Sequence, residues 1–107
     1  MNTITPIELH AWLNDAARPA PVLLDVREPW EFETAHIAGA TLIPMNTIPA
    51  QIDTLDRQAQ TVVICHHGGR SMQVANYLQQ HGFSQVYNLT GGVNAWALKV
   101  DPTMPTY

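Results

Sequence analysis

Cysteine is almost absent from this chain, because Cys65 is the only one among 107 residues. A single cysteine cannot form a disulfide within the chain, which favours a reducing compartment, and we expect the cytoplasm. Long apolar runs are also missing, since the densest stretches, Val22–Val26 and Val62–Cys65, are far too short to cross a bilayer. The first residues, Met1–Pro6, have neither a basic region nor a long apolar segment, so we expect no secretory signal.

Charged residues are scarce, and the acidic ones are unevenly distributed. Asp, Glu, Lys and Arg make up 13% of the chain, with a net charge of −4. This balance argues against nucleic acid as a partner, because phosphate binding needs clustered Lys and Arg. Asp101 is the only acid beyond residue 56, so Cys65 lies within an acid-free stretch over residues 57–100. Such a stretch would suit an anionic substrate, although chance variation in a short chain explains it equally well.

Short apolar segments alternate with helical patterns along the chain. Strands are predicted at Val22–Val26, Thr41–Ile43, Thr61–Ile64 and Val86–Leu89. Helices are predicted at residues 6–14, 28–34 and 48–55, along the face of Val74, Ala75 and Leu78 up to Gly82, and from Gly91 through Trp96. This alternation predicts an α/β fold with a parallel or mostly parallel sheet and helices on both faces. Ligands of such sheets bind at the carboxyl ends of strands, which is where Cys65 lies.

The strand at Thr61–Ile64 runs directly into Cys65–Ser71, whose sequence is Cys-His-His-Gly-Gly-Arg-Ser. The two glycines let the backbone curl so that successive N–H groups point inward. The helix that follows presents unpaired N–H groups and a partial positive charge at its start. Arg70 adds a permanent cation whose donors suit oxyanions. Together they predict an anion cradle around Cys65, which favours the reactive thiolate over the thiol.

A thiolate in this cradle can attack sulfane sulfur and become a persulfide. We expect Cys65 to be the nucleophile and Arg70 to stabilise the anionic donor and the persulfide. The expected substrate-binding groups are the loop amides, which would hold the terminal sulfur; they belong to His66, His67, Gly68, Gly69, Arg70 and Ser71. The hydroxyl of Ser71 is expected to cap the helix, with donation to the anion as the alternative.

The two histidines, His66 and His67, are expected to help bind the donor anion through a partial positive charge, or else to be solvent-facing loop residues. No further Cys or suitably spaced His completes a ligand set with Cys65, so no metal is expected. His36 is expected to hold a turn through a hydrogen bond. The tryptophans are predicted to be core or half-buried anchors; they are Trp12, Trp30 and Trp96.

Three separated motifs resemble those of rhodanese-like domains. They are Cys65–Ser71, Leu24–Phe32 running to His36–Ala40, and Leu89–Trp96. Their order and spacing agree with the family over about residues 3–100. The resemblance implies a five-stranded, mostly parallel sheet flanked by helices on both faces. The length of the chain fits one domain over residues 1–107, and the residues at 101–107 cannot be helical for long, which predicts an extended tail.

The resemblance also implies a function, thiosulfate sulfurtransferase, with a double-displacement reaction. A small anionic donor such as thiosulfate would give sulfur to Cys65, and cyanide, a small thiol or a protein thiol would remove it, without a cofactor. The related phosphatases and arsenate reductases resemble Cys-x5-Arg, whereas this chain has Cys-x4-Arg, which favours sulfur. Asp25 and Arg27 are carried over as architecture rather than catalysis. The alternatives are a protein-interaction or sulfur-relay module and, more remotely, an arsenate reductase or phosphatase.

Overall fold

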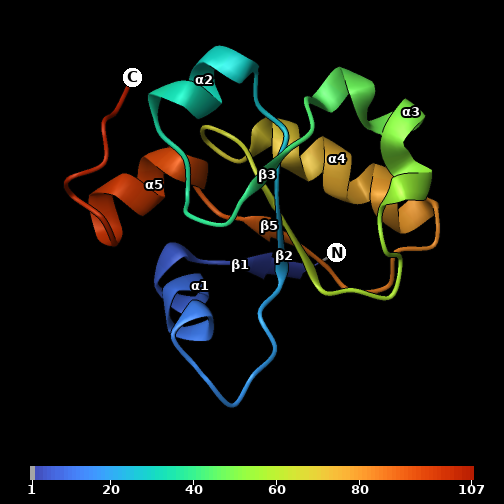
Figure 1. Ribbon diagram of the computed structural model, residues 1–107, viewed down its shortest axis with the longest axis horizontal. Helices are drawn as coiled ribbons and strands as arrows, with labels where there is room; N and C mark the ends of the chain where they lie inside the picture. Colours follow the sequence, from blue (N-terminus) through green and yellow to red (C-terminus); the bar gives the residue numbers. More distant parts are fainter. Residues whose placement is uncertain (1) are drawn as a thin grey trace.

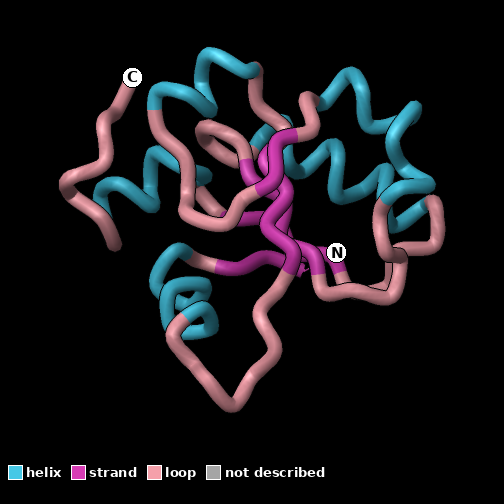
Figure 2. The backbone as a smooth tube through the Cα atoms, in the orientation of Figure 1, coloured by secondary structure: helices cyan, strands magenta, loops and turns pink. Residues whose placement is uncertain are grey.

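The computed structural model describes residues 2–107, which are arranged around a five-stranded sheet (Figure 1). In spatial order the strands are β1 (Asn2–Ile4), β5 (Val86–Leu89), β4 (Thr61–Ile64), β2 (Val22–Asp25) and β3 (Thr41–Leu42). Every neighbouring pair is parallel. The strands form the centre of the molecule, and the helices lie outside them (Figure 2). The predicted α/β class is therefore confirmed, and the sheet is parallel throughout.

Helices cover both faces of the sheet. They are α1 (Pro6–Leu13), α2 (Pro29–Thr34), α3 (Ile48–Gln51), α4 (Gly69–Gln80) and α5 (Gly92–Lys99). Residues of α1 and α5 pack in one buried cluster, and residues of α3 and α4 pack in the other. The start of α1 has the capping box predicted from its sequence: Glu8 N donates to Thr5 Oγ1 at 3.2 Å, and Thr5 N donates to Glu8 Oε1 at 2.9 Å. Within residues 2–107, no helix combines the length and apolar character needed to cross a membrane.

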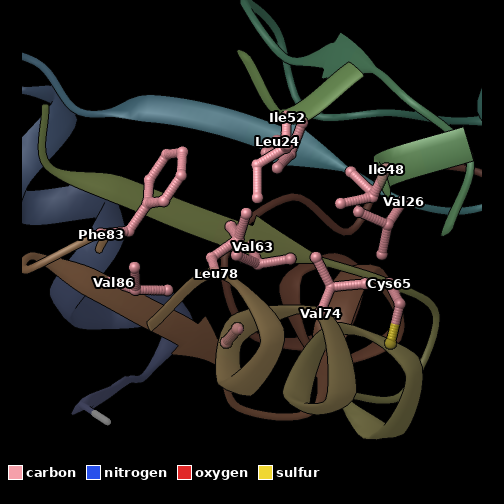
Figure 3. Close-up of a cluster of buried hydrophobic side chains, with 11 residues drawn as sticks. Leu24, Val26, Ile48, Ile52, Val63, Cys65, Val74, Leu78, Phe83 and Val86 are labelled. Atoms are coloured by element: carbon pink, nitrogen blue, oxygen red, sulfur yellow. The ribbon is translucent and has the colours of Figure 1, made fainter. Parts of the chain in front are cut away.

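The central strand β4 supplies side chains to both layers of the core. Val62 and Ile64 belong to the cluster beneath α1 and α5, whereas Val63, together with Cys65 directly after the strand, belongs to the cluster beneath α3 and α4 (Figure 3). Successive side chains of a strand point to opposite faces, and here both faces are covered. This explains why the strand is a continuous apolar run rather than an alternating pattern.

Three features differ from the sequence-based expectations. The edge strand β1 was not predicted, because Asn2 and Thr3 are polar and the strand forms by pairing with β5. The helix expected over residues 48–55 is only one turn, α3, flanked by 3₁₀ turns at Met45–Thr47 and Ile52–Thr54. Trp30 is 59% exposed, so the prediction that it is a core or half-buried anchor is wrong. The other two tryptophans are buried as predicted.

Candidate active site

Cys65 directly follows β4, and its sulfur faces the first turn of α4 (Figure 3). The residue is only 1% exposed. Gly68 N donates to the sulfur at 3.0 Å, and Ser71 Oγ lies 3.3 Å from it. Gly68 stands at the N-cap of α4 with φ +108°, a left-handed conformation that favours glycine. The sequence predicted several loop amides around the sulfur, and the structure has one amide and one hydroxyl in direct contact with it.

The loop is held from behind by the start of α5. Val93 N donates to Cys65 O at 2.8 Å, and Asn94 N donates to His66 O at 3.1 Å. Gly92, with φ +60°, lies so close that a Cβ there would overlap these two carbonyl oxygens. The glycine pair before α5 therefore serves a tight approach of two backbones, in agreement with the tight turn predicted for it. The amides of α5 therefore fix the carbonyls of Cys65 and His66, in the loop whose Gly68 N–H donates to the sulfur.

Ser71 and Asn88 form a small buried network beside the thiol. The Ser71 hydroxyl lies within hydrogen-bond reach of Cys65 Sγ, of Gly68 O at 3.1 Å and of Asn88 Oδ1. Asn88 Nδ2 donates to Gly68 O at 3.2 Å. The expected capping role of Ser71 is wrong, because Gly68 occupies the N-cap and Ser71 lies inside the helix. Asn88 was not singled out from the sequence, although a polar residue inside the apolar strand β5 was a usable signal.

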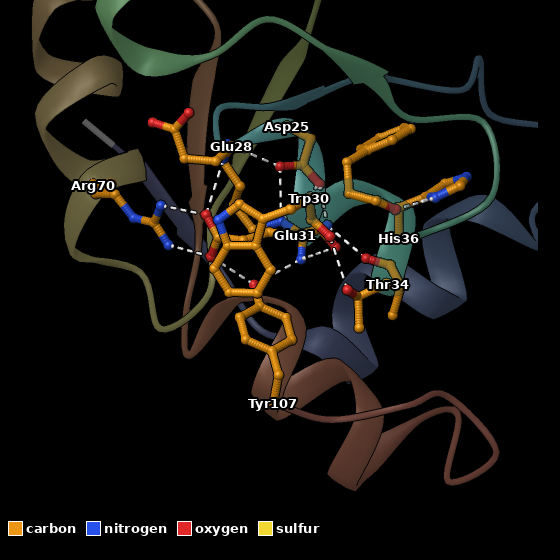
Figure 4. Close-up of polar contacts among 11 residues, drawn as sticks. Asp25, Glu28, Trp30, Glu31, Thr34, His36, Arg70 and Tyr107 are labelled. Carbon is orange, nitrogen blue, oxygen red and sulfur yellow. Dashed lines mark hydrogen bonds and ion pairs between the residues drawn. The ribbon is translucent and has the colours of Figure 1, made fainter.

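The guanidinium of Arg70 is bound to a carboxylate that is distant in the sequence. Arg70 Nη1 and Nη2 donate to Glu31 Oε1 and Oε2 at 2.7 and 2.8 Å (Figure 4). Glu31 also accepts from Glu28 N at 2.9 Å and from the Tyr107 hydroxyl at 2.7 Å. The bonds from Arg70 are the largest cause that lowers the pKa of Glu31 to about 2. The same contact raises the pKa of Arg70 further above its ordinary value. The acid-free stretch of the sequence therefore has an acid beside it in space.

A second ion pair, between Asp25 and Arg27, is fully buried behind the site. Arg27 Nη2 donates to Asp25 Oδ2 at 2.7 Å and to Ala35 O at 2.7 Å, and Nη1 donates to the Tyr107 hydroxyl at 2.9 Å. The pair thus ties the end of β2 to the turn after α2 and to the C-terminal segment. These contacts agree with the architectural role that the resemblance implied. His36 likewise holds its turn, with Nδ1 at 2.9 Å from Phe32 O.

An aromatic cluster lies over the histidine side of the loop. The rings of His66 and Tyr107 stack at 4.1 Å between centroids, and Trp30 meets Tyr107 edge-on at 5.3 Å. Burial and the nearby His67 lower the pKa of His66, which leaves it less charged near neutral pH than the sequence predicted. Tyr107 was not predicted to approach the site. It lies far along the chain from its partners in this cluster, and no local pattern marks it.

A groove of about 370 Å³ runs along the outer side of the loop. Its lining combines loop residues with the ends of β1 and β5: Thr3, His67, Gly68, Gly69, Met72, Asn88, Thr90 and Gly91. Cys65 itself does not line this groove. Across residues 2–107, no group of three or more His, Cys, Asp or Glu is placed to hold a metal ion.

Together these features define an α/β domain with a cysteine loop at the carboxyl edge of a parallel sheet. A model of the rhodanese-like domain family matches residues 5–99. The chain therefore belongs to the rhodanese-like domain family.

Named relatives and solved structures agree with this assignment. A rhodanese-like/PpiC domain-containing protein 12 of Arabidopsis thaliana, described as chloroplastic, is 46% identical over 94% of this chain and 35% of its own length. The chain thus spans about a third of that relative. The thiosulfate sulfurtransferase GlpE of Stutzerimonas stutzeri is 37% identical over 87% of this chain and 82% of its own. The crystal structure of a rhodanese-like domain protein from Staphylococcus aureus is 33% identical with a TM-score of 0.83, covering 90% of this chain and 91% of that one.

Proposed function

We propose that this chain is a sulfurtransferase that moves sulfane sulfur from thiosulfate or a similar donor to cyanide or a thiol through a persulfide on Cys65. The observation that carries the proposal is the Gly68 N–H, which donates to the sulfur at 3.0 Å from the N-cap of α4. This donor stabilises negative charge on sulfur at the positive end of α4, and the Ser71 hydroxyl, whose single proton also has Asn88 Oδ1 and Gly68 O as acceptors, lies 3.3 Å from the sulfur. Relatives named as thiosulfate sulfurtransferases support the same class of reaction.

The proposed reaction has two displacements at sulfur. The Cys65 thiolate attacks the outer sulfur of thiosulfate, the sulfur–sulfur bond of the donor breaks, and sulfite leaves with its electron pair. Cyanide or a thiolate then attacks the outer sulfur of Cys65–S–S⁻, forming thiocyanate or a new persulfide, and Cys65 leaves as the thiolate. Charge and electrons balance in each step, and neither step needs an outside oxidant, a general base or a cofactor.

The terminal sulfur of the persulfide would be held at the start of α4. The amides of Gly69, Arg70 and Ser71 occupy the first helical positions, where an N–H has no carbonyl partner one turn back. They extend the row of donors that Gly68 begins. This is electrostatic stabilisation by preorganised amides, of the kind that oxyanion holes provide.

The loop length favours sulfur transfer over phosphatase or arsenate reductase chemistry. Cys65 and Arg70 are separated by four residues, one fewer than in the Cys-x5-Arg loops of the resembling phosphatases and arsenate reductases. A relay that passes sulfur to a protein thiol uses the same Cys65 chemistry and remains within the proposal. We place this chemistry in the cytoplasm because the nucleophile must remain reduced.

Intact mass spectrometry tests the proposal directly. The reduced protein is incubated with thiosulfate beside Cys65→Ser. We expect a gain of about 32 Da, one sulfur atom, that cyanide reverses and that the variant lacks. If neither thiosulfate nor a polysulfide adds sulfur to Cys65, the proposed function is wrong and the chain is better explained as an interaction module.

A further inference from the structure

We infer that Glu31 is a specificity-determining residue, which cancels the charge of Arg70 and makes the site favour singly charged organic sulfane-sulfur donors over the thiosulfate dianion. The inference rests on the proposed function and concerns the donor used by the same site. It is carried by two observations that the proposed function does not use. One is the charge balance around the loop, and the other is the aromatic cluster of Trp30, Tyr107 and His66.

Both arginines near the loop already have a carboxylate partner. Arg70 makes a two-point contact with Glu31, and Arg27 makes one with Asp25. The Glu31 side chain is 5% exposed and is held by Glu28 N and the Tyr107 hydroxyl as well, so it cannot easily turn away from Arg70. The direct contacts to Cys65 Sγ are then neutral dipoles, from Gly68 and Ser71, rather than free cations.

The charge of the donor decides how strongly this arrangement matters. An anion that approaches the loop is attracted by Arg70 and repelled by Glu31, and the two effects largely cancel because the charges are in contact. The cost of removing an ion from water does not cancel, and in a continuum description it grows with the square of the charge. A dianion entering a loop whose cysteine is 1% exposed meets this cost with little compensation. A singly charged donor meets much less of it.

The aromatic cluster supplies a contact for the organic part of such a donor. Tyr107 stacks on His66, which adjoins Cys65 in the loop, and the exposed Trp30 packs against Tyr107 beside the Arg70–Glu31 pair (Figure 4). Aromatic rings offer apolar area to a methyl or phenyl group and little to the oxygens of a sulfonate. The donor class that fits both observations is an organic thiosulfonate or hydropersulfide.

Two donors that differ mainly in charge make the comparison. Methanethiosulfonate carries one negative charge, and thiosulfate carries two. The Cys65 thiolate attacks the outer sulfur of either one, the sulfur–sulfur bond breaks, and methanesulfinate or sulfite leaves with the electron pair. In both cases Cys65–S–S⁻ remains, so thiocyanate formed with cyanide reports turnover of both donors. Dividing each rate by that of the same donor with free cysteine removes the difference in intrinsic reactivity.

The experiment compares the full chain with Glu31→Gln and Glu33→Gln. After normalisation, the unmodified protein should prefer methanethiosulfonate. Glu31→Gln should raise kcat/KM for thiosulfate about tenfold, through KM, and change that for methanethiosulfonate much less. Glutamine at this position keeps the capping box of α2. Glu33→Gln removes the same charge from an exposed position of the same helix and should alter neither donor.

A second measurement does not depend on turnover. The rates at which iodoacetate and iodoacetamide alkylate Cys65 report access of an anion and of a neutral molecule to the same sulfur. Glu31→Gln should raise the rate with iodoacetate relative to the rate with iodoacetamide, and Glu33→Gln should not. If sulfur is transferred but Glu31→Gln changes neither the preference between the two donors nor the ratio of the iodoacetate rate to the iodoacetamide rate, the inference is wrong and the proposed function stands. If neither donor yields thiocyanate, the proposed function fails, and the alkylation ratio still decides whether Glu31 sets the charge of the site.

Discussion

The contact between Glu31 and Arg70 makes a quantitative prediction about stability. Its two bonds, 2.7 and 2.8 Å long, lower the pKa of Glu31 from 4.5 to about 2. By linkage, a difference of this size between folded and unfolded chains corresponds to about 3 kcal/mol at neutral pH. Because the Arg70 side chain is 37% exposed, solvent screens the pair, and we expect about 1–2 kcal/mol in practice. Glu31→Gln should therefore lower the free energy of unfolding by this amount.

The pH dependence gives the sign of the effect. Since the pKa in the folded protein lies below the ordinary value of 4.5, the contribution is complete well above pH 4.5 and is lost as the pH falls towards 2. Urea unfolding of the unmodified chain, Glu31→Gln and Glu33→Gln at about pH 7, 5 and 3 measures it. The difference in the free energy of unfolding between the unmodified chain and Glu31→Gln should shrink at the lowest pH. Glu33→Gln should have the same free energy of unfolding as the unmodified chain at each pH. A gap of the same size at all three values would refute the electrostatic reasoning and indicate a loss of packing instead.

Three further substitutions test the contacts around the loop. Gly92→Ala should destabilise the chain by about 2 kcal/mol or more, because its Cβ overlaps two carbonyl oxygens at a positive φ; thermal melting measures this. Ser71→Ala should slow persulfide formation at Cys65, followed by mass spectrometry, and lower stability by about 1 kcal/mol, with the exposed Ser84→Ala as a control. Tyr107→Phe should cost about 1 kcal/mol in urea unfolding by removing the hydroxyl bond to Glu31, and no loss would mean that solvent replaces it.

Much of the fold could be predicted because its signals are local. Four of the five strands are short apolar runs, and the box at Thr5 and Glu8 marks a helix start within four residues. The loop from Cys65 to Ser71 carries its own turn residues and leads directly into a helix. Strand β1 was not predicted, because two of its three residues are polar and they form a strand only by pairing with β5. Edge strands that depend on pairing in this way leave little trace in the sequence.

The surroundings of the loop could not be predicted, because they are assembled from distant segments. Arg70 and Glu31 are 39 positions apart, and Tyr107 is 76 positions from Glu31. Counting charges along the chain suggested an acid-free environment, and the fold brings a buried carboxylate into it. Charge patterning along a sequence describes the electrostatics of a site only when the partners are neighbours in the chain.

The contacts of the site involve two sets of groups, the backbone of the cysteine loop and the Arg70–Glu31 ion pair. The carbonyls of Cys65 and His66 are fixed by α5, and Gly68 O is fixed by Asn88, so the donors at the sulfur keep their direction before any substrate arrives. In the proposed function, stabilisation of the sulfur anion would then be a property of the folded backbone and would need no reorganisation during the reaction. Arg70 is not free to contribute in the same way, because its strongest contacts are with Glu31. In the proposed function, the loop would determine which atom reacts, and in the inference drawn from the ion pair, Arg70 and Glu31 would determine which charge can approach that atom.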